Sequence, residues 1–203
     1  MIKAVLFDLG GVFFEDGTEK FLKLLSQKTN KSYEELYPIF RQGKSLEYRE
    51  NKLTGKEFFD WASIKLGHVL SSNELNLLWV SQYTEIDGVR DIVQWLKNQG
   101  LKVGILSDNV PERVNYLQEK YKFLELFDQI FFSYDVNLTK SDTVVFSLAL
   151  NKLNLQPNEV IFVDDRQSNL DIAKEVGIMP ILFTGSESLR DILKQYIERR
   201  IHS

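Results

Sequence analysis

The chain has 203 residues, 43% of them hydrophobic, and carries a formal net charge of −4 at pH 7. This length suits one domain or a core with a small insertion, and the composition excludes a disordered chain. The negative charge and the lack of a basic stripe argue against nucleic acid as a partner, and the absence of cysteine excludes disulfides and thiolate chemistry.

The most informative element comes first, a short apolar run over Ala4–Phe7 that ends at the carboxylate of Asp8. Such a run is typical of a buried parallel strand. Gly10 and Gly11 follow, and glycines let the backbone turn tightly and approach a ligand. Because ligands bind at the carboxyl ends of strands in open α/β sheets, Asp8 is a candidate active-site residue. The run is too short for a signal peptide or a membrane span and no other run is long enough, so we expect a cytoplasmic protein without a membrane partner.

Residues 16–85 contain helical patterns and no convincing strand. Three capping-box patterns mark helix starts in this stretch: Ser32 with Glu35, Thr54 with Glu57, and Ser71 with Glu74. The sheet can continue only if the chain returns near its point of departure, so we expect these helices to sit over the strand ends as a lid. The sequence therefore predicts a core of residues 1–15 and 86–203 with an all-helical cap over residues 16–85.

Alternating strand and helix patterns follow the cap. We expect strands over residues 102–106, 129–132, 160–163 and 180–183. Helical faces lie between them, such as the one formed by Val89, Ile92, Val93 and Leu96. This alternation predicts an α/β fold with a Rossmann-like parallel five-stranded sheet and helices on both faces. We expect the charged tail, residues 198–203, to be a solvated helix end.

Polar residues stand at the ends of these strands. Ser107, Asp108 and Asn109 follow the second strand, Lys140 opens the helix before the fourth, and the fourth ends at Asp164 and Asp165. Converging carboxylates repel each other unless a cation neutralises them, and Mg²⁺ prefers oxygen ligands. A lysine and a hydroxyl beside such a metal suit a phosphate substrate.

These segments together resemble the four motifs of the haloacid dehalogenase (HAD) superfamily. The segments are residues 7–12, residues 106–109, Lys140 and residues 163–169. The resemblance spans nearly the whole core, and the helical insert stands where that family carries a cap. It implies the phosphatase branch of the superfamily.

The resemblance also implies the catalytic roles. Asp8 would attack phosphorus and form an aspartyl-phosphate, which water then hydrolyses. Ser107 would bind the transferring phosphoryl group, helped by the neighbouring amides of Asp108 and Asn109. Lys140 would hold the nucleophile and the phosphoryl oxygens and offset their charge.

The resemblance implies a Mg²⁺ cofactor as well. Its ligands would be Asp8, the backbone carbonyl of Gly10, Asp164 and Asp165. The same family places the reversal of the strand order beside the first strand, so Asp8 would lie at the topological switch point.

The sequence departs from the family at two positions. Most phosphatases of the family carry a second Asp as general acid where this chain has Gly10. We therefore expect a substrate with a good leaving group, or an acid supplied elsewhere, with Glu15 and Asp16 as candidates. Ser141 stands where the family usually has Pro, and it can cap the following helix.

We therefore predict a Mg²⁺-dependent phosphohydrolase acting on a small phosphorylated metabolite such as a sugar phosphate. The sequence leaves two alternatives open. One is a dehalogenase of the same superfamily, and the other is a protein that binds a phosphorylated ligand and barely hydrolyses it. Arg41, Tyr48 and Arg49 of the cap are candidates to reach the substrate. The sequence does not indicate the oligomeric state.

Overall fold

The structure, a computed structural model, describes residues 1–201, without the side chains of residues 198–201. The expectation of a solvated tail over residues 198–203 therefore lies outside what is described in full. Within residues 1–201, no helix combines the length and the apolar character needed to cross a membrane.

The core is a parallel sheet of five strands in the order β3-β2-β1-β4-β5. This confirms the predicted α/β, Rossmann-like fold. The chain adds β2 and β3 on one side of β1 and then crosses to add β4 and β5 on the other, so the order reverses at β1. The strands are β1 (Ala4–Phe7), β2 (Lys102–Ser107), β3 (Gln129–Phe132), β4 (Val160–Asp164) and β5 (Met179–Leu182).

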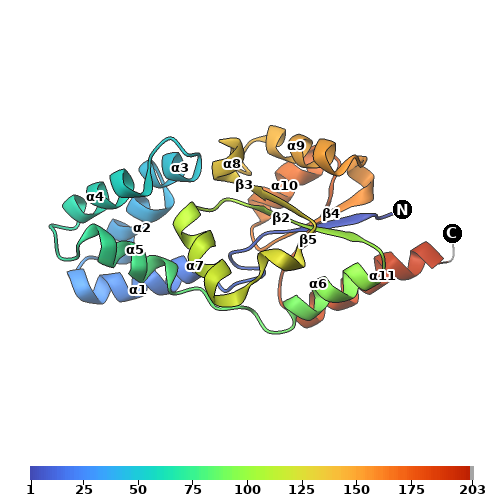
Figure 1. The fold of residues 1–203 in the computed structure, drawn as a ribbon, viewed down its shortest axis with the longest axis horizontal. Coiled ribbons are helices and arrows are strands. Elements are labelled where there is room, and N and C mark those ends of the chain that lie inside the picture. Colours follow the sequence, from blue (N-terminus) through green and yellow to red (C-terminus); the bar gives the residue numbers. More distant parts are fainter. Residues whose placement is uncertain (202–203) are drawn as a thin grey trace.

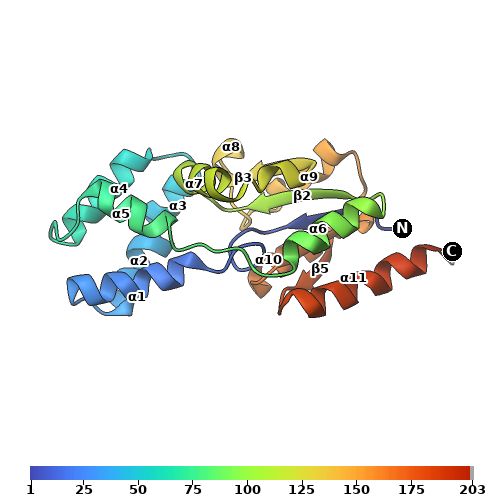
Figure 2. The same cartoon turned by 60° about the horizontal axis from the view of Figure 1, so that its bottom comes forward.

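Helices cover both faces of this sheet (Figures 1 and 2). Along β1, Val5 and Phe7 pack into one apolar cluster, and Ala4 and Leu6 pack into the other. This alternation is the period of two expected of a strand that is buried on both sides. The first cluster includes residues of α6 (Val89–Asn98) and α11 (Ser186–Ile201), and the second includes residues of α9 (Thr143–Leu153) and α10 (Gln167–Glu175).

A separate group of helices lies at one end of the molecule, away from both termini (Figure 1). Its apolar core is built around Phe21, Phe40, Phe58 and Trp79, which are completely buried. All three predicted capping boxes are formed. The helices are α1 (Gly17–Thr29), α2 (Tyr33–Arg41), α3 (Lys44–Arg49), α4 (Gly55–Lys65) and α5 (Ser72–Val80).

The chain leaves the sheet and returns to it along one short antiparallel contact. The amide of Glu15 donates to the carbonyl of Thr84 at 2.9 Å, and the amide of Ile86 donates to the carbonyl of Phe13 at 2.9 Å. We propose this contact as the junction between a core of residues 1–15 and 86–203 and a helical cap of residues 16–85.

Three predicted strands and one predicted helix start differ from the structure. The strands expected over 102–106 and 160–163 each extend one residue further, and the last strand begins and ends one residue earlier than expected. Lys140 precedes α9 instead of opening it, because Asp142 is the residue that caps this helix. Ser141 therefore does not cap it, and its hydroxyl lies 2.7 Å from that of Thr139.

The remaining elements are short or lie beside the strand ends. They are α7 (Pro111–Tyr121), η1 (Leu124–Leu126), α8 (Ser133–Val136) and η2 (Pro157–Glu159). Of these, α7 follows β2 directly and contacts α5 of the helical group, so it links the sheet to the cap.

Candidate active site

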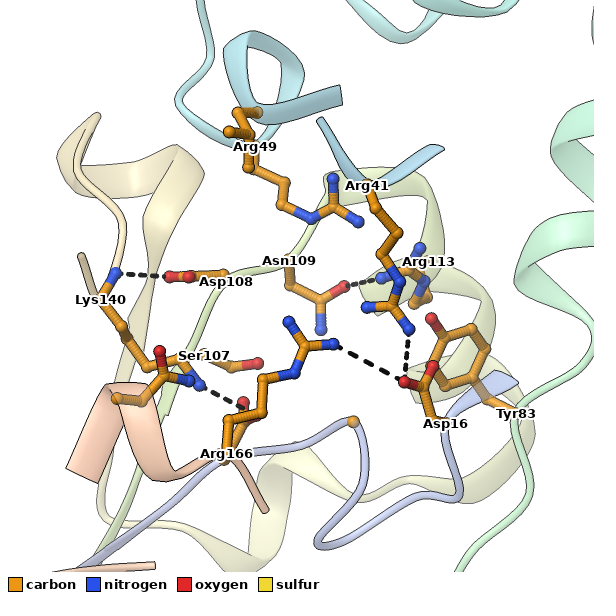
Figure 3. Close-up of a pocket in the computed structure, with 14 residues that line it drawn as sticks. Asp16, Arg41, Arg49, Tyr83, Ser107, Asp108, Asn109, Arg113, Lys140 and Arg166 are labelled. Carbon is orange, nitrogen blue, oxygen red and sulfur yellow. Dashed lines mark hydrogen bonds and ion pairs between the residues drawn. The ribbon is translucent and has the colours of Figure 1, made fainter. Parts of the chain in front are cut away.

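The carboxyl ends of the central strands open onto a cavity of about 90 Å³ beneath the helical group (Figure 3). Because β1 pairs with both β2 and β4, the residues that follow these strands meet there. Asp8, Gly10, Ser107, Asp108, Asn109 and Lys140 all line the cavity. The sequence predicted each of these residues for the site.

Asp8 is 7% exposed and sits between a lysine and a backbone amide. Its Oδ1 accepts from the amide of Leu9 at 2.8 Å, and its Oδ2 lies 2.9 Å from Nζ of Lys140. Burial raises the pKa of Asp8 to about 6. The charge of Lys140 opposes this rise, and the charge of Asp164 adds to it. Asp8 thus presents a poorly solvated carboxyl group at the wall of the cavity.

Lys140 connects the two buried carboxylates. Its Nζ donates to Oδ2 of Asp164 at 2.6 Å as well as contacting Asp8. Burial alone would lower the pKa of Lys140, but Asp8 and Asp164 outweigh it and raise the pKa, so the ammonium stays charged. The backbone amide of Lys140 donates to Oδ1 of Asp108 at 2.9 Å, which fixes the loop that carries the lysine.

Asp164 is completely buried and is held in one orientation. Its Oδ1 accepts from the amide of Arg166 at 2.8 Å, and Nδ2 of Asn169 lies 3.0 Å from each of its two oxygens. Asn169, from the segment of residues 163–169, therefore supports this carboxylate.

Asp8, Asp164 and Asp165 form a compact acidic cluster. One carboxylate oxygen from each lies within 4.8 Å of the others. Burial, with the charge of Asp164, raises the pKa of Asp165, and its buried Oδ1 has no hydrogen-bond partner. A buried oxygen without a partner in such a cluster fits a hard divalent cation such as Mg²⁺.

Gly11 explains why the loop after Asp8 needs glycine. Its φ is +86°, and a Cβ added there would lie 2.2 Å from Oδ2 of Asp165. Gly10 has neither restriction, because a Cβ added at that residue would meet only Tyr83, at 3.7 Å. Gly11 therefore makes room for the acidic cluster, whereas Gly10 is free to carry a side chain.

The helical group contributes arginines to the cavity wall. Arg41 and Arg49 both line it, as the sequence suggested. Tyr48 does not line it, which corrects the expectation, because its ring is buried in the apolar core of the helices and its hydroxyl bonds Glu112 of α7. Arg166, to which the sequence gave no role, lines the cavity from the sheet side.

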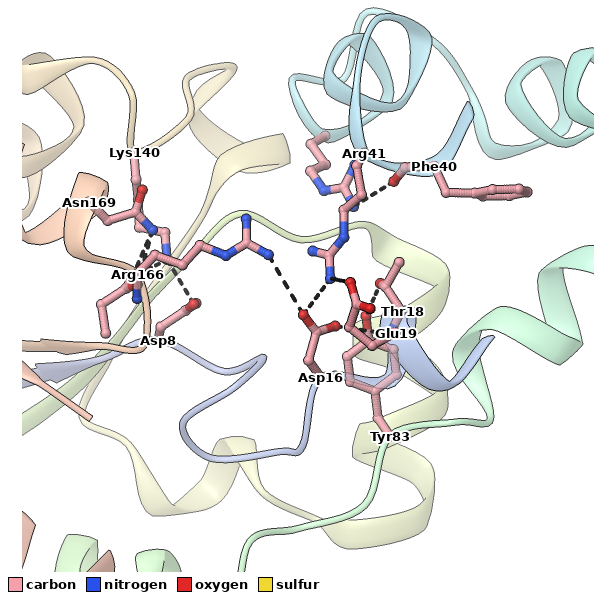
Figure 4. A network of polar contacts seen from close by, with 12 residues as sticks. Asp8, Asp16, Thr18, Glu19, Phe40, Arg41, Tyr83, Lys140, Arg166 and Asn169 are labelled. Carbon is pink, nitrogen blue, oxygen red and sulfur yellow. Dashed lines mark hydrogen bonds and ion pairs between the residues drawn. The ribbon is translucent and has the colours of Figure 1, made fainter. Parts of the chain in front are cut away.

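Asp16 joins the helical group to the core (Figure 4). It caps α1, pairs with Arg41 of α2, and lies 3.7 Å from Arg166. Burial would raise the pKa of Asp16, but Arg41 and Arg166 outweigh it and lower the pKa. The bonds of Glu15 to Lys20 and Thr84 likewise lower its pKa, so both residues favour the carboxylate form.

Sequence reasoning missed Arg113. This side chain is 3% exposed, lines the cavity from the first turn of α7, and donates from Nη1 to Oδ1 of Asn109 at 3.1 Å. An arginine in the first turn of a helix opposes the helix dipole. This unfavourable charge, placed four residues after Asn109, is the sequence pattern that could have identified Arg113 as a site residue.

Known proteins provide an independent comparison. A D-ribitol-5-phosphate phosphatase of Bacteroides thetaiotaomicron is 27% identical over 188 residues, which cover 87% of this chain and 89% of that protein. A HAD family enzyme of the same species, solved with magnesium and inorganic phosphate, matches with a TM-score of 0.75 and 23% identity over 91% of this chain and 96% of that one. A predicted HAD-like family hydrolase of Porphyromonas gingivalis matches with a TM-score of 0.81 and 18% identity over 97% and 98%.

The two solved structures show the shared fold. A family model described as haloacid dehalogenase-like hydrolase matches residues 2–177, which include every strand-end residue of the cavity described above. The sequence motifs, the sheet order and this match agree, and the chain belongs to the haloacid dehalogenase-like hydrolases.

Proposed function

We propose that this hydrolase is a Mg²⁺-dependent phosphatase that cleaves a small phosphorylated metabolite, such as a sugar phosphate, through a covalent intermediate on Asp8. The observation that carries the proposal is the pairing of Asp8 with Lys140 beside an acidic cluster with an unpartnered oxygen on Asp165. The phosphatase name of the Bacteroides relative and the phosphate bound in a structural neighbour support it.

The reaction has two displacements at phosphorus. In the first, a carboxylate oxygen of Asp8 bonds to phosphorus, and the bond from phosphorus to the leaving oxygen breaks. In the second, water bonds to phosphorus, the bond to Asp8 breaks, and inorganic phosphate leaves. Lys140 stays near Asp8 throughout and offsets charge, and Ser107 binds a phosphoryl oxygen with the amides of Asp108 and Asn109.

The cation would be held by Asp8, the carbonyl of Gly10, Asp164 and Asp165. When bound, it neutralises the carboxylates and the phosphate oxygens so that they can approach each other. Asn169, Arg166 and Lys140 hold Asp164 in place for this role. Asp8 and Asp164 raise the pKa of Lys140, so this residue remains an ammonium.

The missing acid limits the substrate. Gly10 carries no side chain, and the lowered pKa values of Glu15 and Asp16 keep both as carboxylates. A placed general acid contributes about 10²–10⁴-fold to such a reaction. We therefore propose a substrate whose leaving group departs with little proton transfer, such as a sugar 1-phosphate or an acyl phosphate.

Phosphate release from p-nitrophenyl phosphate tests the proposal, because this ester needs little acid help. We expect turnover by the wild type with Mg²⁺, none in chelator, and none by Asp8→Asn under either condition. Binding of phosphate esters without release of phosphate would support the ligand-binding alternative. Release of halide from a 2-haloacid would support the dehalogenase alternative.

A further inference from the structure

One end of the cavity holds more positive charge than its carboxylates neutralise. We call the residues Arg41, Arg49 and Arg113 the arginine end. Arg41 pairs with Asp16, but no carboxylate among the side chains described lies within ion-pair distance of Arg49 or Arg113, which are 5% and 3% exposed. Because burying a charge is costly unless it is paired, these two groups call for an anion that the described chain does not supply.

One edge of the Arg113 guanidinium lacks hydrogen-bond partners. Its Nη1 is used by Asn109, but Nε and Nη2 are buried without a hydrogen-bond partner. These two nitrogens lie on the same side of the planar guanidinium, which is the arrangement that binds a carboxylate or phosphate through two parallel bonds. The guanidinium carbon lies 4.3 Å from the ring centroid of Trp79 and 4.5 Å from that of Tyr83, so two aromatic rings hold it in place.

The position of Arg113 on its helix argues against a purely structural role. It is the third residue of α7, where the helix dipole favours anions and disfavours a cation. The same helix start would favour an oxyanion bound beside it. The fold therefore tolerates an unfavourable charge at a point where a ligand would make it favourable.

Arg49, on α3, also lacks a counter-charge within ion-pair distance among the side chains described. Its Nη1 donates to the carbonyl of Ser45 at 2.7 Å, and its Nη2 lies 3.4 Å from the carbonyl of Phe40. These neutral partners hold the side chain without compensating its charge. Burial, together with the charges of Arg113 and Arg41, lowers the pKa of Arg49 to about 9.

The arginine end is separate from the residues that handle the phosphoryl group. Lys140 and Ser107 lie on one side of the close view, and Arg113 and Arg41 lie on the other (Figure 3). A second view places Asp8 and Lys140 together, across the cavity from Arg41 (Figure 4). A phosphoryl group held by Asp8 and Lys140 therefore leaves the arginine end for another part of the substrate.

We propose that the arginine end binds a second oxyanion of the substrate, so that the substrate is a small phosphate monoester with a carboxylate or a second phosphate at its far end. This proposal rests on the proposed function and deepens it. A hydroxyl group would satisfy hydrogen bonds but would leave both arginines without a counter-charge. An oxyanion supplies the bonds and the charge together.

A matched set of substrates tests the proposal with the wild type alone. It consists of a five-carbon sugar 1-phosphate with only hydroxyls at its far end (called the polyol phosphate below), the uronic acid 1-phosphate of equal length, the corresponding 1,5-bisphosphate, and p-nitrophenyl phosphate as reference. We expect kcat/KM for the acid or the bisphosphate to exceed that for the polyol phosphate by about 10- to 100-fold, the range of a hydrogen bond to a charged group. The better of the two identifies the oxyanion as a carboxylate or as a phosphate.

Variants separate recognition from structural support. Arg113→Gln removes the charge of Arg113 and keeps a donor for Asn109. Arg49→Gln removes the charge of Arg49 and keeps an amide donor there. Both should abolish the preference, so that the ratio of kcat/KM for the anionic substrate to kcat/KM for the polyol phosphate falls to about one. Arg113→Lys keeps the charge but cannot form two parallel bonds, so it should retain part of the preference. Arg90→Gln is the matched control, because Arg90 pairs with Glu85 and the carbonyl of Tyr121 and does not line the cavity.

The outcomes separate this proposal from the proposed function. Equal hydrolysis of the polyol phosphate and its anionic counterparts by the wild type overturns the second-oxyanion proposal and leaves the phosphatase standing. The same conclusion follows if folded Arg113→Gln and Arg49→Gln lower kcat/KM equally for every substrate. No hydrolysis of any ester, p-nitrophenyl phosphate included, overturns both.

Discussion

The two ends of the cavity differ in how their charges are compensated. At the catalytic end, Lys140 contacts both Asp8 and Asp164, and the buried Oδ1 of Asp165 has no hydrogen-bond partner. At the arginine end, no carboxylate among the side chains described lies within ion-pair distance of Arg49 or Arg113. The first end offers carboxylate oxygens to a cation, whereas the second offers guanidinium nitrogens to an anion.

The two ends also differ in where their residues come from. The catalytic end is built from residues at the carboxyl ends of β1, β2 and β4, together with Lys140 from the loop before α9, so the sheet and its connecting loops position it. The arginine end draws on α2, α3 and α7, and it forms only when the helical group packs over the sheet. The chemistry and the choice of substrate should therefore respond to different mutations.

The largest effect is expected from Asp8→Asn, which removes the nucleophile and leaves the arginine end intact. Turnover should fall by roughly 10⁴-fold or more, as for other catalytic nucleophiles, and the fold should persist. Calorimetry should still detect binding of the anionic substrate to the variant. Asp91→Asn, at an exposed position of α6, is the control and should match the wild type. Residual activity close to wild type in Asp8→Asn would rule out covalent catalysis by this residue.

A pH effect on stability should be specific to the catalytic end. Burial raises the pKa of Asp8 from 3.8 to about 6, so the folded chain binds this proton more tightly than the unfolded chain does. The stability that this carboxyl contributes is therefore fully present below pH 3.8 and is lost as the pH rises to about 6. In chelator, Asp8→Asn should gain roughly 3 kcal/mol of unfolding free energy relative to the wild type across this window. A difference between the two proteins that stays constant with pH would contradict this.

Two glycine substitutions test whether the acidic cluster constrains the loop after Asp8. Gly11→Ala places a Cβ against the carboxylate of Asp165 and forces a positive φ on a residue with a side chain. It should cost about 1–3 kcal/mol of unfolding free energy, measured by denaturant titration, and weaken Mg²⁺ binding. Gly10→Ala, which meets only ordinary contact, should be nearly neutral in both measurements. Equal effects of the two substitutions would show that Asp165 does not constrain this loop.

The smallest effect is expected from adding a carboxyl group at Gly10, which lines the cavity. Gly10→Asp introduces a carboxyl where the family usually carries its acid, and the space at Gly10 accepts a side chain. Turnover of esters with poor leaving groups should rise roughly tenfold, a part of what a well-placed acid provides. Hydrolysis of p-nitrophenyl phosphate should change little. A fall in rate for both classes of ester would count against the missing acid as the limit.

Local sequence patterns predicted the catalytic end well. Asp8 ends an apolar strand, and parallel strands bring their carboxyl ends to one edge of the sheet, so the meeting of Asp8, Ser107 and Asp164 follows from topology. The helix starts at Ser32 and Thr54 were equally readable, because a capping box depends on residues only three apart.

Long-range packing decided what the sequence could not reveal. The burial of Arg113 depends on Trp79 and Tyr83, which lie thirty or more residues earlier in the chain and enclose its guanidinium. Tyr48 looked as able as Arg49 to reach the substrate, but its ring stacks on Phe58 inside the helical core. The shift of the cap from Ser141 to Asp142 is a local competition between two good capping residues, which spacing alone does not resolve.

Trapping the phosphoryl group on the enzyme is the most direct test of the central claim. The wild type would be mixed with Mg²⁺ and an activated phosphate ester, quenched in acid within one turnover, and its peptides analysed by mass spectrometry. We expect a phosphoryl group on the peptide that contains Asp8, and none in the Asp8→Asn variant. Release of inorganic phosphate with no label on Asp8, or a label on another residue, would contradict the account.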